Sequence, residues 1–176
     1  MVRNNFEFPL LHTISDSRCQ SCLAEHNCPG GWDKLSDGDH CYRLFNEKKN
    51  WDDAERFCQS QHGGHLAAVT NQEIHDYINS KGRDMWVGGT DRQNEGGWSW
   101  SDCSDWGFTK WRGPRRDPLT FQQPDDGDWW YRTEDCLILR HEDDDQWHDL
   151  RCGEQHQFVC SIKLCPPAGE DKLSPR

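Results

Sequence analysis

The sequence lacks a long apolar run, and it also lacks an excess of basic residues. No stretch approaches the roughly 20 apolar residues that a membrane-spanning helix needs. The opening residues, MVRNNFEFPL, contain no apolar run long enough for a signal peptide. The 31 acidic and 20 basic residues give a formal net charge of -11, whereas nucleic-acid-binding proteins carry basic faces. We therefore expect no membrane insertion and no nucleic-acid partner.

Hydrophobic residues are also scarce, at 33% of the 176 residues, and no Asn-X-Ser/Thr sequon for N-glycosylation is present. Such a core needs support, and the chain has ten cysteines and ten tryptophans to provide it. The cysteines do not form the repeated C-x-x-C pairs of zinc ribbons. They indicate disulfides and an oxidising, extracellular compartment. We interpret the chain as a mature or engineered form of a secreted protein.

The chain divides into an N-terminal arm, one domain and a C-terminal tail. Residues 1–27 show no clear periodicity and carry Cys19 and Cys22. From residue 28 onward, turn residues alternate with short aromatic strands, which is typical of hairpins. The predicted domain covers residues 28–163, and the tail covers residues 164–176. One domain of this size is expected from the chain length.

Two helices and several antiparallel strands are predicted within the domain. The segment NWDDAERFCQSQ reads as a helix because Asn50 can cap it and acidic residues fill its first turn. Thr70 and Glu73 have the spacing of a capping box, which opens a second helix. Strands are predicted at residues 85–91, 96–102, 136–140 and 156–163. A long Gly-, Pro- and Asp-rich stretch, residues 101–135, predicts a functional or disordered loop. The fold class is α+β.

Acidic residues concentrate in that loop. The segment QQPDDGDWWYRTEDC, residues 122–136, contains five carboxylates, and the tripeptide WHD follows at residues 147–149. Calcium takes about six to eight oxygen ligands from carboxylates, carbonyls and waters. Clustered carboxylates repel one another, and a bound Ca²⁺ relieves that repulsion. The pattern favours a calcium site, with a solvated acidic loop as the alternative.

These motifs, in this order, resemble the C-type lectin-like domain family. That family has two helices, a WIGL-like strand, a loop tripeptide of the type Glu-Pro-Asn or Gln-Pro-Asp, and Trp-Asn-Asp before its last two cysteines. The corresponding segments here are WVGGTD at 86–91, QPD at 123–125, WHD at 147–149, Cys152 and Cys160. The resemblance spans residues 28–163. It implies the α+β C-type lectin-like fold in its long form, without catalytic activity.

The resemblance also implies three disulfides, which are Cys28–Cys41, Cys58–Cys160 and Cys136–Cys152. Four cysteines are then left, namely Cys19, Cys22, Cys103 and Cys165. Because the two chain ends lie side by side in the family's fold, Cys165 could meet Cys19 or Cys22. The others could join two chains in a disulfide-linked homodimer. Sequence alone does not decide between these pairings.

Two calcium sites are implied by the resemblance. The sugar-binding site would use Gln123, Asp125, Glu134, His148 and Asp149, with Pro124 in the cis form. A second site, which braces the loop, would use Asp91, Glu95, Asp126 and Asp135. Gln-Pro-Asp resembles the galactose type of this family. The implied function is a secreted, calcium-dependent lectin for galactose or N-acetylgalactosamine, as used in innate defence. The sugar would contact Gln123, Asp125, Glu134 and His148, with Trp129 or Trp130 stacked on its apolar face.

His148 departs from this pattern, because the family has Asn there. Imidazole has no oxygen and suits zinc or copper better than calcium. Three outcomes are open: a water replaces the lost oxygen, the ion binds weakly, or the site stays empty. With the ion bound, His148 would act as a pH switch, since free histidine titrates near about 6.5. The main alternative function is a structural, protein-binding or mineral-binding domain without sugar binding. An enzyme is disfavoured, because no nucleophile elbow and no H-E-x-x-H pair is present.

Overall fold

The computed structural model describes residues 22–24, 27–36, 38–113, 123–125, 133–141 and 146–166. Within these ranges an eight-stranded sheet has the strand order β1-β2-β8-β4-β6-β7, with β3 paired to β8 and β5 paired to β4. The strands are β1 (Asp33–Lys34), β2 (His40–Lys49), β3 (His65–Leu66), β4 (Met85–Thr90), β5 (Ser99–Trp100), β6 (Cys136–Arg140), β7 (Gln146–Leu150) and β8 (His156–Lys163). The helices are α1 (Trp51–Ser60) and α2 (Gln72–Asn79). The predicted α+β class is confirmed.

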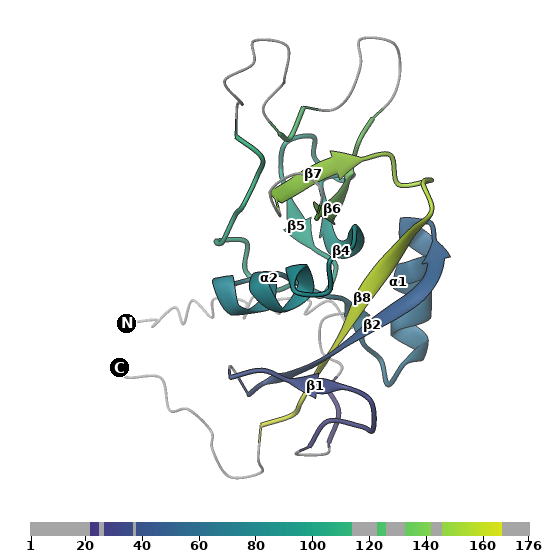
Figure 1. Ribbon diagram of the computed structural model, residues 1–176, viewed down its shortest axis with the longest axis vertical. Helices are drawn as coiled ribbons and strands as arrows, with labels where there is room; N and C mark the ends of the chain where they lie inside the picture. Colours follow the sequence, from purple (N-terminus) through teal and green to yellow (C-terminus); the bar gives the residue numbers. More distant parts are fainter. Residues whose placement is uncertain are drawn as a thin grey trace, which may run out of the picture.

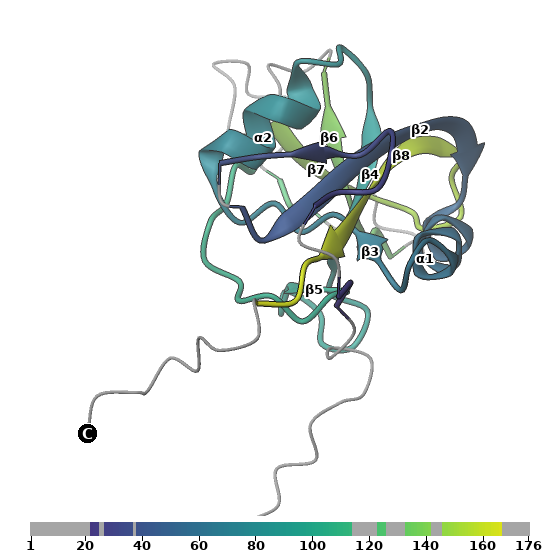
Figure 2. The ribbon, with the colours of Figure 1, turned by 90° about the horizontal axis from the view of Figure 1, so that it is seen from below.

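The central strands β4, β6 and β8 are mostly buried on both faces, with α1 and α2 on different sides of the sheet (Figures 1 and 2). Successive strand residues alternate between two core clusters, as the two-residue period of a strand requires. On β6, Ile138 packs with α1 and Trp86 in one cluster, while Leu137 and Leu139 pack with α2 in the other. No helix in the described ranges is long and apolar enough to cross a bilayer.

Helix α1 begins as the sequence predicts. The side chain of Asn50 accepts a hydrogen bond from the backbone N–H of Asp53 at 2.8 Å, which satisfies one of the free donors at the helix start. The inward face carries Trp51, Ala54 and Cys58, which are all buried. Glu55 lies on the same face and is also buried.

Helix α2 begins one residue later than the capping-box pattern predicts. The N-cap is Asn71, whose side chain accepts from the backbone N–H of Ile74 at 3.0 Å. Glu73 does not bond back to Thr70 in the manner of a capping box. Its carboxylate instead accepts from the backbone N–H and the hydroxyl of Ser36, next to β1. The capping-box assignment is therefore wrong, because a long-range bond to Ser36 takes the glutamate.

Disulfides hold the two ends of the domain together. The three pairs implied by the resemblance, Cys28–Cys41, Cys58–Cys160 and Cys136–Cys152, are present in the structure. A fourth joins Cys22 to Cys165, so one open pairing is settled. Beside it, Leu23 and Leu164 form a parallel bridge. Cys103 is disulfide-bonded as well, and none of the nine cysteines in the described ranges is a free thiol.

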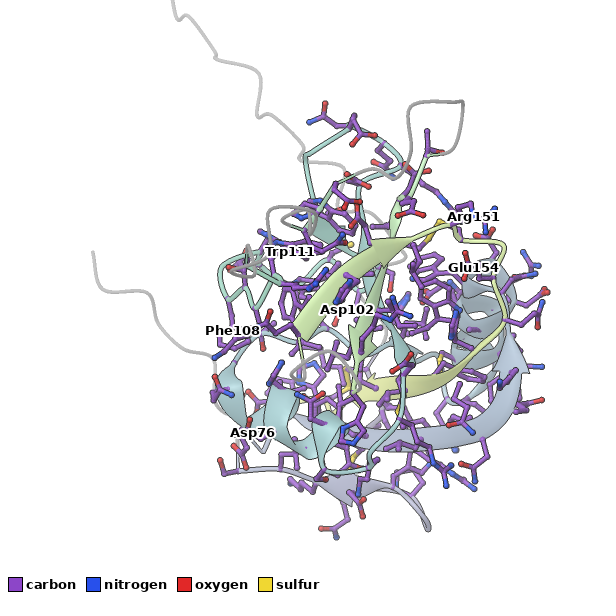
Figure 3. The ribbon with its side chains drawn as sticks, turned by 45° about the horizontal axis from the view of Figure 1, so that its top comes forward. Asp76, Asp102, Phe108, Trp111, Arg151 and Glu154 are labelled. Carbon is purple, nitrogen blue, oxygen red and sulfur yellow. A yellow bond between two sulfur atoms is a disulfide. The ribbon has the colours of Figure 1, made fainter. Side chains whose placement is uncertain are left out.

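A cluster of aromatic rings supports the base of the long loop. Trp147 of β7 is fully buried and is contacted at its ring by Trp100, Trp106, Phe108 and Trp111. Figure 3 shows Phe108 and Trp111 on the α2 side of the molecule. The backbones of Lys110 and Arg112 also hydrogen-bond to Trp147, at 2.9 and 3.1 Å. This cluster fixes β7, a strand that the sequence patterns did not predict.

Candidate calcium site

The Gln-Pro-Asp tripeptide is tied to the end of β7. The Gln123–Pro124 peptide bond is cis, as the resemblance implies. The buried side chain of Gln123 accepts from the backbone N–H of Asp149 through Oε1 at 3.1 Å. The backbone N–H of Gln123 donates to the carbonyl oxygen of Arg112 at 2.9 Å. The tripeptide is therefore held both by β7 and by the segment that contains Arg112.

Three carboxylates converge at this point. Asp125 follows the cis bond, Glu134 precedes β6, and Asp149 lies on β7. One oxygen from each lies within 4.8 Å of the others, and we call these residues the three-carboxylate cluster. Burial and the neighbouring carboxylates of Asp149 and Asp125 raise the pKa of Glu134 to about 7. Like charges held this close are costly without a cation, and carboxylate oxygens are the ligands that calcium prefers.

His148 does not join the three-carboxylate cluster. It lies on β7 opposite Ile138 of β6, and its side chain is buried. Burial of the ring and the positive charges of Arg140 and Arg112 lower the pKa of His148 to about 4. The ring is therefore neutral throughout the range in which free histidine titrates. Burial of the imidazole and the two guanidinium charges therefore argue against the predicted pH switch near neutral pH.

The predicted bracing residues are only partly brought together. The backbone N–H of Asp91 donates to the carbonyl oxygen of Asp135 at 3.3 Å, which joins the ends of β4 and β6. The buried carboxylate of Asp91 accepts from the backbone N–H of Gly96 at 3.0 Å, and Glu95 in this turn is exposed. In the part of the chain that the structure describes, these residues do not form a group of three close carboxylates. Asp126 lies outside the described residues.

The predicted sugar-stacking residues Trp129 and Trp130 also lie outside the described residues. Sequence reasoning missed Glu154, whose charge contributes to the raised pKa of Glu134, and Arg151, whose charge opposes it. These two residues form an ion pair at 3.0 Å after β7, on the α1 side of the molecule (Figure 3). Their proximity to Cys152 in the sequence is the signal that could have found them.

Three kinds of comparison agree with this geometry. The family model described as "Lectin C-type domain" matches residues 47–162. A snaclec from the snake Philodryas olfersii is 32% identical over 148 residues, which cover 79% of this chain and 81% of that protein. Snaclec 3 from Sistrurus catenatus edwardsii is 33% identical over 147 residues, which cover 76% of this chain and 83% of that protein.

Two solved structures match at comparable levels. The human scavenger receptor C-type lectin carbohydrate-recognition domain is 28% identical, with a TM-score of 0.65 over 78% of this chain and 99% of that one. A calcium-independent type II antifreeze protein is 27% identical, with a TM-score of 0.65 over 79% of this chain and 96% of that one. The family match, the cysteine pairs and the cis Gln-Pro-Asp loop lead to one conclusion: this chain belongs to the C-type lectin domain family.

Proposed function

We propose that this protein is a calcium-dependent, non-catalytic lectin of the galactose or N-acetylgalactosamine type. The observation that carries the proposal is the three-carboxylate cluster beside a cis Gln-Pro-Asp loop. Asp125, Glu134 and Asp149 would supply carboxylate oxygens to the ion, and Gln123 would supply its amide oxygen. A calcium ion shares its oxygen shell with vicinal sugar hydroxyls, while acid and amide side chains accept from and donate to the same hydroxyls.

The proposal omits His148 as a calcium ligand and as a sugar contact. The residue is only 4% exposed, and its ring provides no oxygen. Water would complete the shell in place of the missing amide. Trp129 and Trp130 remain our candidates for the ring that covers the apolar face of the sugar. We also retain a second calcium site at Asp91, Glu95, Asp126 and Asp135 as part of the proposal.

The disulfides also bear on where the protein is found and on how its chain is assembled. Disulfides persist in oxidising compartments, so the protein would be secreted. The carbohydrate-recognition domain would comprise residues 28–163, with the arm and tail joined by Cys22–Cys165. A disulfide-linked homodimer receives no support from the described cysteines, because all of them are already bonded. A non-reducing gel tests for such a dimer.

The second candidate is a structural or protein-binding domain of the same fold without a sugar ligand. The burial of His148 favours it, because the position that provides an amide in the family provides none here. The similarity to a calcium-independent antifreeze protein also supports it. Fold alone does not decide between the two candidates.

Calorimetric titration with galactose, N-acetylgalactosamine and mannose, in calcium and again in EDTA, tests the proposal. Galactose binding that requires calcium supports the lectin. Asp149→Asn should abolish that binding, and Asp39→Asn, which removes the same charge from an exposed residue, should not. Calcium binding without any sugar binding would overturn the lectin function and leave the structural candidate.

A further inference from the structure

A second cleft, separate from the proposed calcium sites, opens beside helix α1. Its volume is about 560 Å³, and none of the proposed calcium ligands lines it. The wall is formed by α1, the start of β3, the end of β4 and the segment that follows β5. Trp51 and Trp100 also line it, with 5% and 3% of their surfaces exposed. We call it the α1 cleft.

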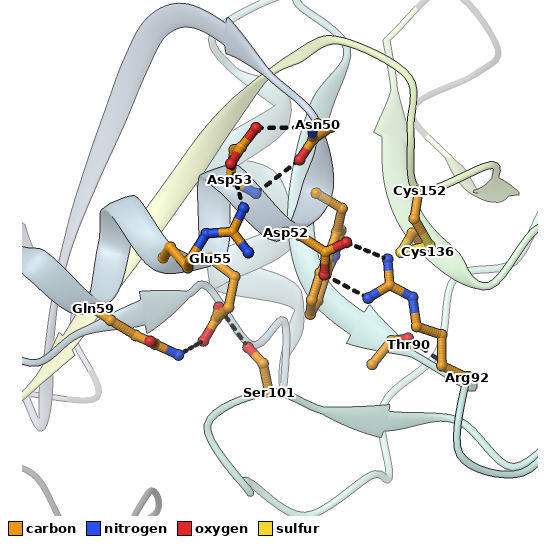
Figure 4. Close-up of polar contacts among 12 residues, drawn as sticks. Asn50, Asp52, Asp53, Glu55, Gln59, Thr90, Arg92, Ser101, Cys136 and Cys152 are labelled. Atoms are coloured by element: carbon orange, nitrogen blue, oxygen red, sulfur yellow. Dashed lines mark hydrogen bonds and ion pairs between the residues drawn. A yellow bond between two sulfur atoms is a disulfide. The ribbon is translucent and has the colours of Figure 1, made fainter.

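Glu55 contributes a buried carboxylate to this wall, and its oxygens are fully engaged by the protein. It accepts from the Nδ1 of His65 at 2.6 Å and from the backbone N–H of Leu66 at 2.8 Å. It also accepts from Gln59 at 2.9 Å and from the hydroxyl of Ser101 at 3.0 Å (Figure 4). A carboxylate offers about four lone-pair sites. Glu55 therefore shapes the cleft and has no lone pair left for a charged ligand.

Arg92, a second charged residue that lines the α1 cleft, is also paired. The guanidinium of Arg92 meets both carboxylate oxygens of Asp52, at 2.5 and 3.1 Å, and lies 5.2 Å from the centre of the Trp51 ring. Figure 4 shows this pair between α1 and the end of β4. With Glu55 held by its donors and Arg92 held by Asp52, the cleft does not demand a charged partner.

The serine hydroxyls of the cleft can accept hydrogen bonds from a ligand, because each donates its own proton to another group of the protein. Ser99 donates its proton to the carbonyl oxygen of Thr90 at 3.3 Å, and Ser101 donates to Glu55. Ser104, which also lines the cleft, donates to Asp102 at 2.9 Å. The remaining lone pairs of these three oxygens suit a ligand that supplies several O–H donors. The exposed amides of Gln59 and Gln93 add further acceptors and donors.

We propose that the α1 cleft is a calcium-independent binding site for an uncharged, hydroxyl-rich small molecule of monosaccharide size. The serine oxygens accept from its hydroxyls, and the small exposed parts of Trp51 and Trp100 contact its C–H groups. The volume is within the range of about 300–1,000 Å³ that small-molecule sites occupy. This inference goes beyond the proposed lectin function and does not depend on it.

The test is a galactose titration of the full chain in EDTA, followed by ¹H–¹⁵N NMR of backbone amides and indole N–H groups. The titration is repeated with the Asp149→Asn variant, so that binding at the calcium site is removed both by EDTA and by the substitution. We expect saturable shifts confined to residues 99–104 and the Trp51 indole, with a dissociation constant on the order of millimolar. If the proposed calcium-dependent sugar binding were not found, these shifts should still be observed.

Ser99→Phe fills the cleft from an exposed strand position and should reduce the affinity at least tenfold. The matched control, Ser80→Phe at the exposed end of α2, should keep it. Galactosamine and galacturonate test the ligand class, and neither should bind more tightly than galactose. An absence of shifts, shifts that survive Ser99→Phe, or a strong preference for either charged sugar would overturn the proposal.

Discussion

The backbone N–H of Asp125 donates to both carboxylate oxygens of Asp149, at 3.2 and 3.0 Å. Asp149 therefore holds the Gln-Pro-Asp loop in place and also contributes to the three-carboxylate cluster. Its own backbone N–H is bonded to Gln123, so loop and strand are linked in both directions. The acidic site consequently has a rigid half, made by Asp125 and Asp149, to which Glu134 is added from the start of β6.

Replacement of Asp149 by Asn separates these two tasks. The amide oxygen can still accept from Asp125, so the loop should keep its position, but the cluster loses one negative charge. We expect the calcium affinity to fall at least tenfold, or by about 1.4 kcal/mol. Calorimetric calcium titration measures this loss, and Asp39→Asn is the charge-matched control. An unchanged affinity in Asp149→Asn would exclude the cluster as the calcium site.

Replacement of Glu134 by Gln should have opposite effects with and without calcium. In EDTA, removal of a carboxylate that repels Asp125 and Asp149 should stabilise the fold by up to about 1 kcal/mol, which is about 2–4 °C in Tm for a chain of this size. Calcium should stabilise the variant less than it stabilises the wild type, because the variant has lost a calcium ligand. Thermal unfolding under both conditions checks the reversal, and the same order of Tm values in both would contradict it.

The sequence allowed much of this architecture to be predicted for local physical reasons. Asn50 caps α1 through a contact three residues away, so the pattern alone was sufficient. Three of the disulfides and the cis Gln123–Pro124 bond were predicted through the ordered motifs of the family. Asp125 and Asp149 were predicted as neighbours in the same way, and the structure brings them together.

The errors arise where distant residues compete with local ones. Glu73 was assigned to its own helix start, but Ser36, 37 positions away, binds it. His148 was assigned to the calcium site from its position in the WHD tripeptide. Its burial and its pKa depend instead on β6 and on Arg112. His65 is buried against Glu55, a pair that the sequence patterns did not predict. A carboxylate four positions after Trp51, on the inward face of α1, was the available signal for that pair.

Glu55 should make the stability of the fold depend on pH. Burial alone would raise its pKa, but hydrogen bonds from His65 and from the Leu66 backbone, together with the charge of His65, lower it below the ordinary value of 4.5. A carboxyl group with a lowered folded pKa contributes stability that is complete above the unfolded pKa and is lost as pH falls through the folded pKa. The loss from Glu55 should therefore occur below pH 4.5.

Glu55→Gln should lower the free energy of unfolding at neutral pH by about 1–3 kcal/mol, because buried donors lose a charged acceptor. It should also flatten the decline in stability below the ordinary pKa of the glutamate. Urea unfolding across the acidic range measures both effects. Glu47→Gln, at an exposed site on β2, is the control. Parallel stability curves for wild type and Glu55→Gln would show that this carboxyl is not the source of the decline.

Loss of the Cys22–Cys165 disulfide should reduce stability without affecting the calcium site. The pair joins the two ends of the described chain just beyond β8, at the end of the molecule away from β7, which carries Asp149 (Figure 1). We expect the Cys22→Ser, Cys165→Ser double variant to lose about 2–4 kcal/mol of stability and to retain its calcium affinity.

The comparison is the Cys136→Ser, Cys152→Ser double variant, which removes the disulfide next to Glu134 and Asp149. This second variant should lose calcium affinity as well as stability. Chemical unfolding and calcium titration of both variants separate the two roles. A loss of calcium affinity in the Cys22 and Cys165 variant would show that the two ends of the domain are coupled.

The aromatic cluster around Trp147 gives the protein an optical probe at a useful place. The indole N–H groups of Trp98, Trp100 and Trp147 are buried without a hydrogen-bond acceptor in the described part of the chain, so their fluorescence should resemble that of indole in an apolar medium. Trp100 and Trp147 are 5.7 Å apart at an interplanar angle of 84°, a geometry in which their electronic transitions couple and give near-ultraviolet circular dichroism. Because the same strand carries Asp149, occupation of the three-carboxylate cluster should change both signals without any added label.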